Sequence, residues 1–440
     1  MCGIIGVVGD HDVVPRLLEG LQRLEYRGYD SAGIATVNNN VICRQRAEGK
    51  IVNLDARLKL EPLAGHTGIA HTRWATHGAA VEVNAHPHSD GQVAIVHNGI
   101  IENFQELRLR LESQGYTFET ETDSEVIVHL ISYYREAGLD HIASAHAAIK
   151  DLNGAYALSI LFADQENLLI GARKGSPLAV GVGSGEMFLG SDALALAPLT
   201  QRICYLEDGD WVVLSRDSMQ VNDAIGNAQN RDVKKTTLTG ALVGKGNYSH
   251  FMIKEIHEQS QVIAETLHVL MNANTRTVTM PVFPFSIADI TQVTIVACGT
   301  SYFAGLITKY WIEQLARVSV DVDIGSEFRY REPPMVKGGL AIFISQSGET
   351  ADTLAALQYC KAKGQHILSI INVAESEMAR QSDAVLLTKA GPEIGVASTK
   401  AFTTQLTVLA VFAIYLARAK QELDLASEQQ LVSELIEVPA

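Results

Sequence analysis

The sequence predicts two folded parts: an α+β part in which helices cover β-sheets, then an α/β part built on a parallel sheet. The length of 440 residues exceeds what one ordinary core accommodates. The first half is rich in short apolar runs bounded by Gly, Asn and Asp, with few segments of helical spacing. From about residue 290, apolar strands alternate with helices of about 12 residues, which is typical of βαβ units.

The composition is that of a soluble globular protein, with 47% hydrophobic and 19% charged residues. A formal net charge of −15, with no run of Lys and Arg, argues against binding to nucleic acid. The cysteines are odd in number, widely spaced and free of any C-x-x-C pair, so we expect no disulfides, no zinc knuckle and a reducing cytoplasm as the location. They are Cys2, Cys43, Cys204, Cys298 and Cys360. We also expect no cofactor.

The first domain is expected over residues 1–225. Its strands are predicted from runs rich in Val and Ile, in chain order GIIGVV, GIATV, TGIAHT, QVAIVHNG, AYALSILFA, NLLIGAR, MFLGSD and DWVVLS. Helical spacing is found in VVPRLLEGLQRL, FQELRLRLESQG and SEVIVHLISYYREAG. Many strands with few helices favour sheets covered by helices.

Residues 226–284 are predicted to be a linker and a connecting helix. The linker is polar and has no clear period, and the helix is HFMIKEIHEQSQVIAETLHVLM. The second domain is expected over 285–440, ending in a helical tail, with strands VTIVA, LAIFI, HILSIIN and DAVLLTKAG. These strands are apolar without alternation, as strands buried on both faces of a parallel sheet are.

The most apolar late stretch, FTTQLTVLAVFAIYLA, is predicted to be a buried helix. It is shorter than the ~20 residues that a bilayer span needs, and it contains three Thr and a Gln. We therefore expect no membrane contact.

The chain begins MCGIIGVVG, with a cysteine directly behind the initiator methionine. Removal of the methionine is favoured before a small residue and would leave Cys2 with both a thiol and a free α-amine. A free α-amine titrates near neutral pH and is able to take the proton of its own thiol, as in the N-terminal nucleophile variants of the catalytic triad. The alternative is a cysteine that only begins a strand.

Further positions in this half carry polar groups suited to an amide substrate. Arg73, in HTRWATHG, suits bidentate binding of a carboxylate, with a surface ion pair as its alternative. Asn98 and Gly99 offer a side-chain amide and a backbone N–H, the donors of an oxyanion hole, although Asn-Gly is also a strong signal for a hairpin turn. Asp123 could receive a substrate ammonium or be the N-cap of the helix that follows it.

A metal site is the competing interpretation of this half. Six histidines fall between His66 and His97, and His86 with His88 could form an H-x-H ligand pair. No nearby carboxylate or cysteine completes a usual ligand set, so we expect no metal.

The combination of MCGIIGV, LEYRGYDSAG, HTRWATHG, NAHPH, HNGIIEN and ETDSEVI resembles the type-2 glutamine amidotransferase domain. The resemblance implies an N-terminal nucleophile fold of two stacked antiparallel sheets between helix layers, a four-layer αββα arrangement. It implies that Cys2 attacks the side-chain amide of glutamine, while Asn98 and Gly99 hold the oxyanion. The other implied roles are Arg73 for the α-carboxylate, Asp123 for the α-ammonium, Thr76 and His77 for the pocket, Trp74 for passage of ammonia and Arg27 for a loop that closes over glutamine.

In the second half, two predicted strands lead into CGTS, from Cys298 to Ser301, and SQSGET, from Ser345 to Thr350. Each loop is followed by a predicted helix, and hydroxyls at a helix N-terminus suit an anion such as phosphate. Ligands of open α/β sheets bind outside the carboxyl ends of the strands. Neither a Walker lysine nor a G-x-G-x-x-G motif is present, which disfavours a nucleotide. Ordinary Ser/Thr helix capping is the alternative.

Both loops, with SEFRYRE and EIGVASTKAFTTQ, resemble the sugar isomerase (SIS) domain. The resemblance implies that Ser345, Gln346, Ser347 and Thr350 hold a sugar phosphate. It also implies that Thr300 and Ser398 meet sugar hydroxyls, with Gly299, Ser301 and Val396 shaping the pocket.

The two parts together resemble the amidotransferases that make glucosamine 6-phosphate and glutamate from fructose 6-phosphate and glutamine. This resemblance implies passage of ammonia inside the protein and a homodimer formed through the sugar domains. That family carries two SIS units and a tail, and the second unit and tail hold the Schiff-base lysine and the other isomerisation residues. Residues 1–440 contain only the first unit, so we expect this polypeptide alone to hydrolyse glutamine without completing the sugar chemistry.

Two other functions stay open at this point. A phosphoribosyl amidotransferase uses the same thiol chemistry, but it should carry an acidic phosphoribosyl diphosphate loop where CGTS and SQSGET stand. A sugar-phosphate-binding regulatory scaffold could also use an SIS unit, usually beside a basic helix-turn-helix, whereas here a domain resembling an amidotransferase precedes it.

Overall fold

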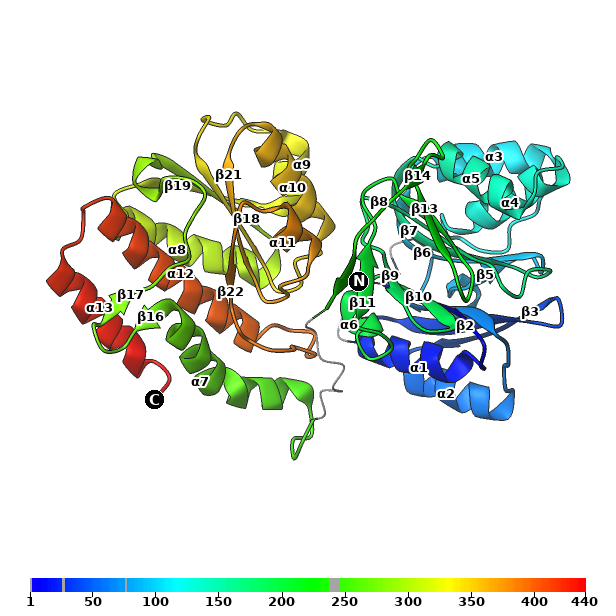
Figure 1. Cartoon of the computed structure of the whole chain (residues 1–440), viewed down its shortest axis with the longest axis horizontal. Helices are drawn as coiled ribbons and strands as arrows, with labels where there is room; N and C mark the ends of the chain where they lie inside the picture. The colour runs from blue at the N-terminus through cyan, green and yellow to red at the C-terminus, as the bar shows by residue number, and fades with distance from the viewer. Residues whose placement is uncertain (1, 26–27, 76, 237–244) are drawn as a thin grey trace. The chain divides into compact units, whose positions relative to one another are not determined.

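A computed structural model describes residues 2–25, 28–75, 77–236 and 245–440. The chain divides into two compact units, Met1–Leu242 and Val243–Ala440 (Figure 1).

The first unit contains two antiparallel sheets. The eight-stranded sheet has the order β15 (Val233–Lys235), β11 (Arg202–Tyr205), β9 (Ala179–Val182), β10 (Glu186–Gly190), β1 (Gly3–Gly9), β4 (Thr67–Arg73), β2 (Ser31–Asn38) and β3 (Val41–Glu48). The seven-stranded sheet has the order β14 (Ala228–Gln229), β13 (Met219–Asn222), β12 (Trp211–Leu214), β8 (Leu169–Lys174), β7 (Gly154–Phe162), β6 (Val93–Ile101) and β5 (His88–Ser89).

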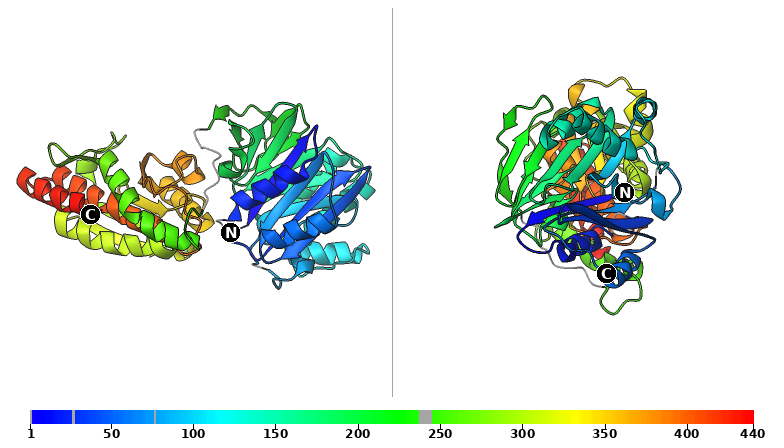
Figure 2. Two further views of the ribbon diagram at one scale, coloured as in Figure 1. Left: turned by 90° about the horizontal axis from the view of Figure 1, so that it is seen from below. Right: turned by 90° about the vertical axis from the view of Figure 1, so that its right-hand side faces the viewer.

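Helices cover the outer faces of both sheets (Figure 1 and Figure 2). The eight-stranded sheet packs against α1 (Val14–Arg23), α2 (Ile51–Leu60) and α6 (Ala193–Leu196). The seven-stranded sheet packs against α3 (Phe104–Ser113), α4 (Glu125–Glu136) and α5 (His141–Asp151). A third apolar cluster joins the inner faces of the two sheets. This αββα arrangement confirms the fold class predicted for the first part.

Strand β1 shows why the sequence builds these layers. Side chains alternate across a strand, so Ile4 and Val8 enter the core between the sheets while Ile5 and Val7 pack against the helix layer. Gly6 shares the inner face, where an added Cβ would lie 2.9 Å from Ser159 Oγ of the facing sheet. Because both faces of the strand are buried, its sequence is continuously apolar.

The segment predicted as linker and connecting helix, 226–284, is divided between the units. Strands β14 and β15 extend the two sheets of the first unit, although their two and three residues are too short to show a period in the sequence. Helix α7 (Phe251–Leu270) and the hairpin of β16 (Met271–Asn272) and β17 (Thr277–Val278) belong to the second unit. Residues Ile263 and Leu267 of α7 pack in the core of the second unit.

The second unit is built on a five-stranded parallel sheet, which confirms the predicted α/β class. Its order is β19 (Ser319–Ile324), β18 (Gln292–Ala297), β20 (Leu340–Ser345), β21 (His366–Ile371) and β22 (Ala384–Leu387). One face packs against α7, α8 (Gly299–Ala316), α12 (Lys400–Ala419) and α13 (Leu425–Glu437), and the other against α9 (Gly325–Arg331), α10 (Ala351–Ala362) and α11 (Glu377–Gln381) (Figure 1).

Within the described residues, helix α12 alone is long and apolar enough to cross a membrane. Of its most apolar window, 72% is buried inside the protein, where Val408, Phe412 and Leu416 contribute to the core. The helix therefore has a packing role in this unit, in agreement with the buried helix predicted from the sequence.

Replacing Phe343 by alanine is expected to lower the free energy of unfolding of the second unit by about 3–5 kcal/mol, because this β20 side chain is fully buried. Phe303→Ala is the matched control, since Phe303 is 55% exposed on α8, and its effect should stay within about 0.5 kcal/mol. Urea unfolding followed by circular dichroism measures both, and equal losses would contradict the assigned core.

Candidate functional site

Cys2 lies immediately before β1, at the end of the strand where it pairs with β4. Its thiol is partly exposed, and Sγ accepts a hydrogen bond from the backbone N–H of Trp74 at 3.1 Å. Its carbonyl oxygen accepts from Asn98 Nδ2 at 3.2 Å. The structure therefore brings together two of the predicted catalytic positions that are 96 residues apart in the chain.

Asn98 and Gly99 lie within β6, where they pair with Ala157 and Tyr156 of β7, so the hairpin-turn alternative is wrong. Gly99 has φ +133°, and a Cβ at this position would lie 2.0 Å from the carbonyl oxygen of Ala155. Only glycine fits this close approach of the two strands. Gly99 is exposed, in contrast to the buried Asn98.

Arg73 is the last residue of β4 and is buried. Its guanidinium donates to the carbonyl oxygens of His77 at 2.6 Å and Ala79 at 3.1 Å, and lies 3.9 Å from the carboxylate of Asp30. A surface ion pair, the alternative for this arginine, is not what the structure shows. The guanidinium instead fixes the loop that follows the strand.

Asp123 precedes α4 but is not its N-cap, which is Ser124. The Asp123 carboxylate accepts from the backbone N–H of Ile101 at 2.8 Å and from the Ser124 hydroxyl at 3.4 Å. The Ser124 hydroxyl in turn lies 2.9 Å from His97 Nδ1. These contacts hold the buried Asp123 carboxylate beside the end of β6, the strand that also carries Asn98 and Gly99.

The remaining predicted residues of this half surround the same loop. Trp74 is 49% exposed, and its ring would lie 3.4 Å from a Cβ at Gly28. The His77 ring meets the Phe104 ring edge-on at 5.7 Å. Two predicted residues, Arg27 and Thr76, lie outside the described residues.

Four histidines are buried behind these groups. The ring centroids of His71 and His86 are 4.2 Å apart, and those of His86 and His88 are 4.3 Å apart. Burial lowers the pKa of His71 and of His88 to about 3, and it also lowers the pKa of His86 and His97. These rings are therefore neutral at pH 7. Among the described residues, no group of three or more His, Cys, Asp or Glu is arranged to hold a metal ion.

Two polar residues at this site were missed by the sequence reasoning. His71 Nε2 lies 2.9 Å from the Asn98 side-chain oxygen, and Asp30 lies beside Arg73. The signal for His71 was available, because it is two residues before Arg73 in a strand and so shares its face. Asp30 carried no comparable signal, since it precedes β2 and reaches Arg73 only through sheet pairing.

In the second unit, the two predicted phosphate loops follow β18 and β20, which are adjacent parallel strands. Ser345 Oγ accepts from Gly348 N–H at 3.0 Å and Ser347 Oγ accepts from Glu349 N–H at 3.2 Å, so the second loop closes on itself. The N-caps of α8 and α10 are Cys298 and Thr350, and neither makes a side-chain capping hydrogen bond. The capping alternative therefore does not account for the hydroxyls.

The other predicted sugar residues differ in their exposure. Gly299 and Thr300 are exposed at the start of α8, while Ser301 is buried; Gln346 is half-buried.

Val396 and Ser398 lie in the loop that leads into α12. Val396 is 83% exposed, and Ser398 donates to Glu393 Oε2 at 3.0 Å. Glu255 of α7 accepts from the backbone N–H of Gly395 at 3.0 Å, and a Cβ at Gly395 would lie 2.5 Å from that carboxylate. The loop is thus fixed by buried carboxylates that the sequence reasoning did not single out.

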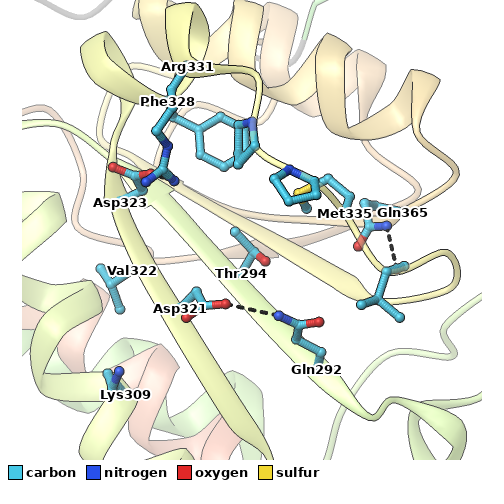
Figure 3. Close-up of a pocket in the computed structure, with 13 residues that line it drawn as sticks. Gln292, Thr294, Lys309, Asp321, Val322, Asp323, Phe328, Arg331, Met335 and Gln365 are labelled. Atoms are coloured by element: carbon cyan, nitrogen blue, oxygen red, sulfur yellow. Dashed lines mark hydrogen bonds and ion pairs between the residues drawn. The ribbon is translucent and has the colours of Figure 1, made fainter.

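A cavity of about 260 Å³ lies in the second unit away from these loops (Figure 3). On its wall, Gln292 donates to Asp321 at 2.9 Å and Gln365 donates to the carbonyl of Val336 at 2.7 Å. Gln292 begins β18 and Asp323 lies next to the end of β19, so the cavity runs along these two strands, whereas the polar loops follow β18 and β20. The predicted sugar residues do not line it.

Comparison with known proteins assigns both units. Residues 71–198 match the glutamine amidotransferase domain, and residues 286–415 match the SIS domain. The glutamine–fructose-6-phosphate aminotransferase (isomerizing) of Brucella abortus is 56% identical over 439 residues, which cover 100% of this chain and 72% of the relative. The protein chain belongs to the glutamine–fructose-6-phosphate aminotransferase family.

Another member of the glutamine–fructose-6-phosphate aminotransferase family, from Zymomonas mobilis, is 56% identical over 440 residues, again covering 100% of this chain and 72% of the relative. A solved C-terminal domain of glucosamine-fructose-6-phosphate aminotransferase from Francisella tularensis matches with 42% identity and a TM-score of 0.43, over 45% of this chain and 56% of that chain. The identity to the curated relatives extends over both units, which favours this family over the phosphoribosyl amidotransferase and regulatory alternatives.

Acid is expected to destabilise the first unit below about pH 6.5, the ordinary pKa of histidine. The unfolded chain takes up protons as the pH falls, whereas the buried rings, with pKa values lowered to about 3 at His71 and His88, do not. The contribution of the buried rings to the free energy of unfolding is therefore fully present above pH 6.5. Below pH 6.5, each ring lowers the free energy of unfolding by about 1.4 kcal/mol per pH unit.

Urea unfolding between about pH 7.5 and 5.5, where histidines dominate titration, measures this slope. His88→Phe should reduce the slope by about the contribution of one ring, and an unchanged slope would contradict the burial of a neutral histidine there.

Gly99→Ala is expected to lower the free energy of unfolding by about 1–3 kcal/mol more than Gly91→Ala does. Both glycines have positive φ, +133° and +92°, so both substitutions strain the backbone. Only the Cβ at position 99 also collides with a carbonyl, because a Cβ added at Gly91 would meet no atom of another part of the chain within 4 Å. Equal losses in thermal unfolding would show that β6 and β7 are not this close.

Proposed function

We propose that this chain belongs to an enzyme of glutamine-dependent amination of fructose 6-phosphate, the reaction that yields glucosamine 6-phosphate and glutamate, and that residues 1–440 alone carry out its glutamine-hydrolysing half. The observation that carries the proposal is the position of Cys2, whose backbone carbonyl accepts from the Asn98 amide while its thiol accepts from the Trp74 N–H. The family match over the whole chain supports the choice of substrates, because the relatives are named for glutamine and fructose 6-phosphate.

In the first step, the Cys2 thiolate attacks the side-chain amide carbon of glutamine. The α-amine exposed by loss of the initiator methionine takes the thiol proton and returns it to the departing nitrogen, so ammonia leaves and a thioester remains. Water then hydrolyses the thioester to glutamate and regenerates the thiol. In both steps the oxyanion receives hydrogen bonds from Asn98 Nδ2 and the Gly99 backbone N–H.

Recognition of glutamine is assigned to the charged groups around this thiol. Arg73 supplies a guanidinium for the α-carboxylate and Asp123 a carboxylate for the α-ammonium, with Thr76 and His77 at the pocket. These assignments are supported by the burial of both charged side chains next to the strand ends that carry Cys2 and Asn98. Trp74 and Arg27 are assigned to ammonia passage and to the closing loop.

The sugar phosphate is assigned to the loops after β18 and β20. Parallel strands β18 and β20 end at the same edge of the sheet, and this supports a single anion site formed by the hydroxyls and helix N-termini that follow them. The phosphate is assigned to Ser345, Gln346, Ser347 and Thr350. The sugar is assigned to Thr300 and Ser398, with Gly299, Ser301 and Val396 around it.

The setting of the enzyme is also part of the proposal. A cytoplasmic location is supported by five cysteines that are all free thiols. The net charge of −15 favours small metabolites over nucleic acid as partners. A homodimer formed through the sugar domains follows from the family resemblance.

The polypeptide of residues 1–440 is expected to release glutamate from glutamine, and Cys2→Ala is expected to lose at least about 1,000-fold in kcat because the nucleophile is gone. Cys43→Ala is the matched control, since this half-buried thiol of β3 takes no part in the chemistry. Glutamate is assayed with and without fructose 6-phosphate, together with glucosamine 6-phosphate and the intact mass of the chain.

Glutamate release that depends on Cys2 and on loss of the methionine supports the first half of the proposal. We expect no glucosamine 6-phosphate from these residues alone, and its appearance would overturn that expectation. Glutamate release that persists in Cys2→Ala would contradict the assigned nucleophile.

A further inference from the structure

The imidazole of His71 joins the two sheets at the candidate glutaminase site. Its Nε2 lies 2.9 Å from the Asn98 side-chain oxygen, and Asn98 Nδ2 donates to the Cys2 carbonyl at 3.2 Å. His71 comes from β4 of one sheet and Asn98 from β6 of the other. The imidazole therefore meets the side-chain amide that the proposed oxyanion hole uses.

An asparagine amide has two orientations that differ by half a turn, and its hydrogen-bond partners decide between them. A donor at His71 Nε2 requires the Asn98 oxygen to point toward the ring, which directs the NH₂ group toward Cys2. If Nε2 were an acceptor instead, the amide would turn and present its oxygen to Cys2. An oxygen there would repel the oxyanion that the NH₂ group should stabilise.

We propose that His71 is a positioning residue that fixes the orientation of the Asn98 amide, with its NH₂ group toward Cys2. The inference rests on the proposed glutaminase function and adds a residue that touches neither glutamine nor the thiol.

The surroundings of His71 hold its ring in place. It is fully buried, and its ring lies against that of His86 at 4.2 Å. On the neighbouring strand, Gly33 pairs with His71, and a Cβ there would lie 2.2 Å from the His86 carbonyl oxygen. The strand next to His71 and the segment that carries His86 are therefore closely packed around the ring.

The protonation state is consistent with this role. Burial lowers the pKa of His71 to about 3, so the ring is neutral through the physiological range and carries one proton. The Asn98 oxygen selects the tautomer with that proton on Nε2. The effect of His71 on catalysis should therefore not depend on pH between about 6 and 8.

The test uses the polypeptide of residues 1–440 and three variants. His71→Phe keeps the ring but removes the donor, and His71→Gln keeps an N–H near the position of Nε2. His88→Phe is the matched control, because His88 is equally buried in the same histidine cluster but contacts Thr122 instead of Asn98.

His71→Phe is expected to lower kcat for glutamate release by about 10- to 100-fold. This loss is smaller than the loss in kcat of about 10²–10³-fold that follows removal of an oxyanion donor itself. KM for glutamine should change by less than about threefold, since the lost interaction acts on the transition state. His71→Gln should recover most of kcat, and His88→Phe should retain it. The loss in His71→Phe should be the same across about pH 6–8.

A kcat loss equal in His71→Phe and His88→Phe, or no recovery in His71→Gln, would overturn the inference by showing a packing effect only. A loss confined to KM would overturn it as well.

A second measurement does not depend on turnover. In chains labelled with ¹⁵N at asparagine, nuclear Overhauser contacts from the Asn98 NH₂ protons to Cys2 should be present in the parent and His88→Phe and absent in His71→Phe. Contacts retained in His71→Phe would overturn the inference. If the parent releases no glutamate, the proposed function fails, while this measurement still decides what holds Asn98.

Discussion

The two-residue period of paired strands is the constraint on which the first site depends. In β4, Ile69 and His71 share the inner face, and in β6 Val96 and Asn98 do the same on the facing sheet. Stacking the sheets brings the inner-face side chains of the two strands together. The polar side chains of His71 and Asn98 therefore meet next to the apolar core between the sheets. Cys2 enters the same arrangement because β1 pairs with β4. A slip of one residue in any of these strands would turn the polar groups away from one another.

The second unit places its polar groups by a different rule. Parallel strands β18 and β20 end at the same edge, so the segments that follow them lie together whatever their own conformation. The geometry of the loops is then set by hydrogen bonds that backbone N–H groups donate to the side chains of Ser345, Ser347 and Glu393. The first site is formed mainly by residues of strands, and the second site mainly by residues of loops. This difference is consistent with the different folds of the two units.

The fold class of both units was predictable because it depends on how apolar residues are spaced. The short Val- and Ile-rich runs and the βαβ alternation are local patterns that the tertiary structure preserves. The short strands β14 and β15 were not predictable, since two or three polar residues at a sheet edge carry no period. The boundary of the second unit was missed for a related reason, because α7 is amphipathic and a sequence does not show which core receives its apolar face.

Motifs in the sequence identified the candidate site residues. Whether a residue had an ordinary structural role instead, such as a turn or an N-cap, was harder to judge from the sequence. Asn98-Gly99 looks like a turn in the sequence, but the positive φ of Gly99 allows close strand pairing instead. Asp123 looks like an N-cap, but its carboxylate binds Ile101 N–H across the sheet edge. Contacts between residues far apart in the chain decide both cases, and those contacts leave no local pattern.

The carboxylates of α7 determine where the second unit begins in the chain. Glu255 binds the backbone of Gly395, and Glu258 pairs with the buried Lys400 at 2.7 Å. These bonds tether the loop that carries Val396 and Ser398 to a helix 140 residues earlier in the chain. A fragment that began at residue 285, where the strand and helix alternation starts, would contain every assigned sugar residue and lose the tether. The autonomous piece of this protein that preserves the sugar loop therefore starts before Phe251.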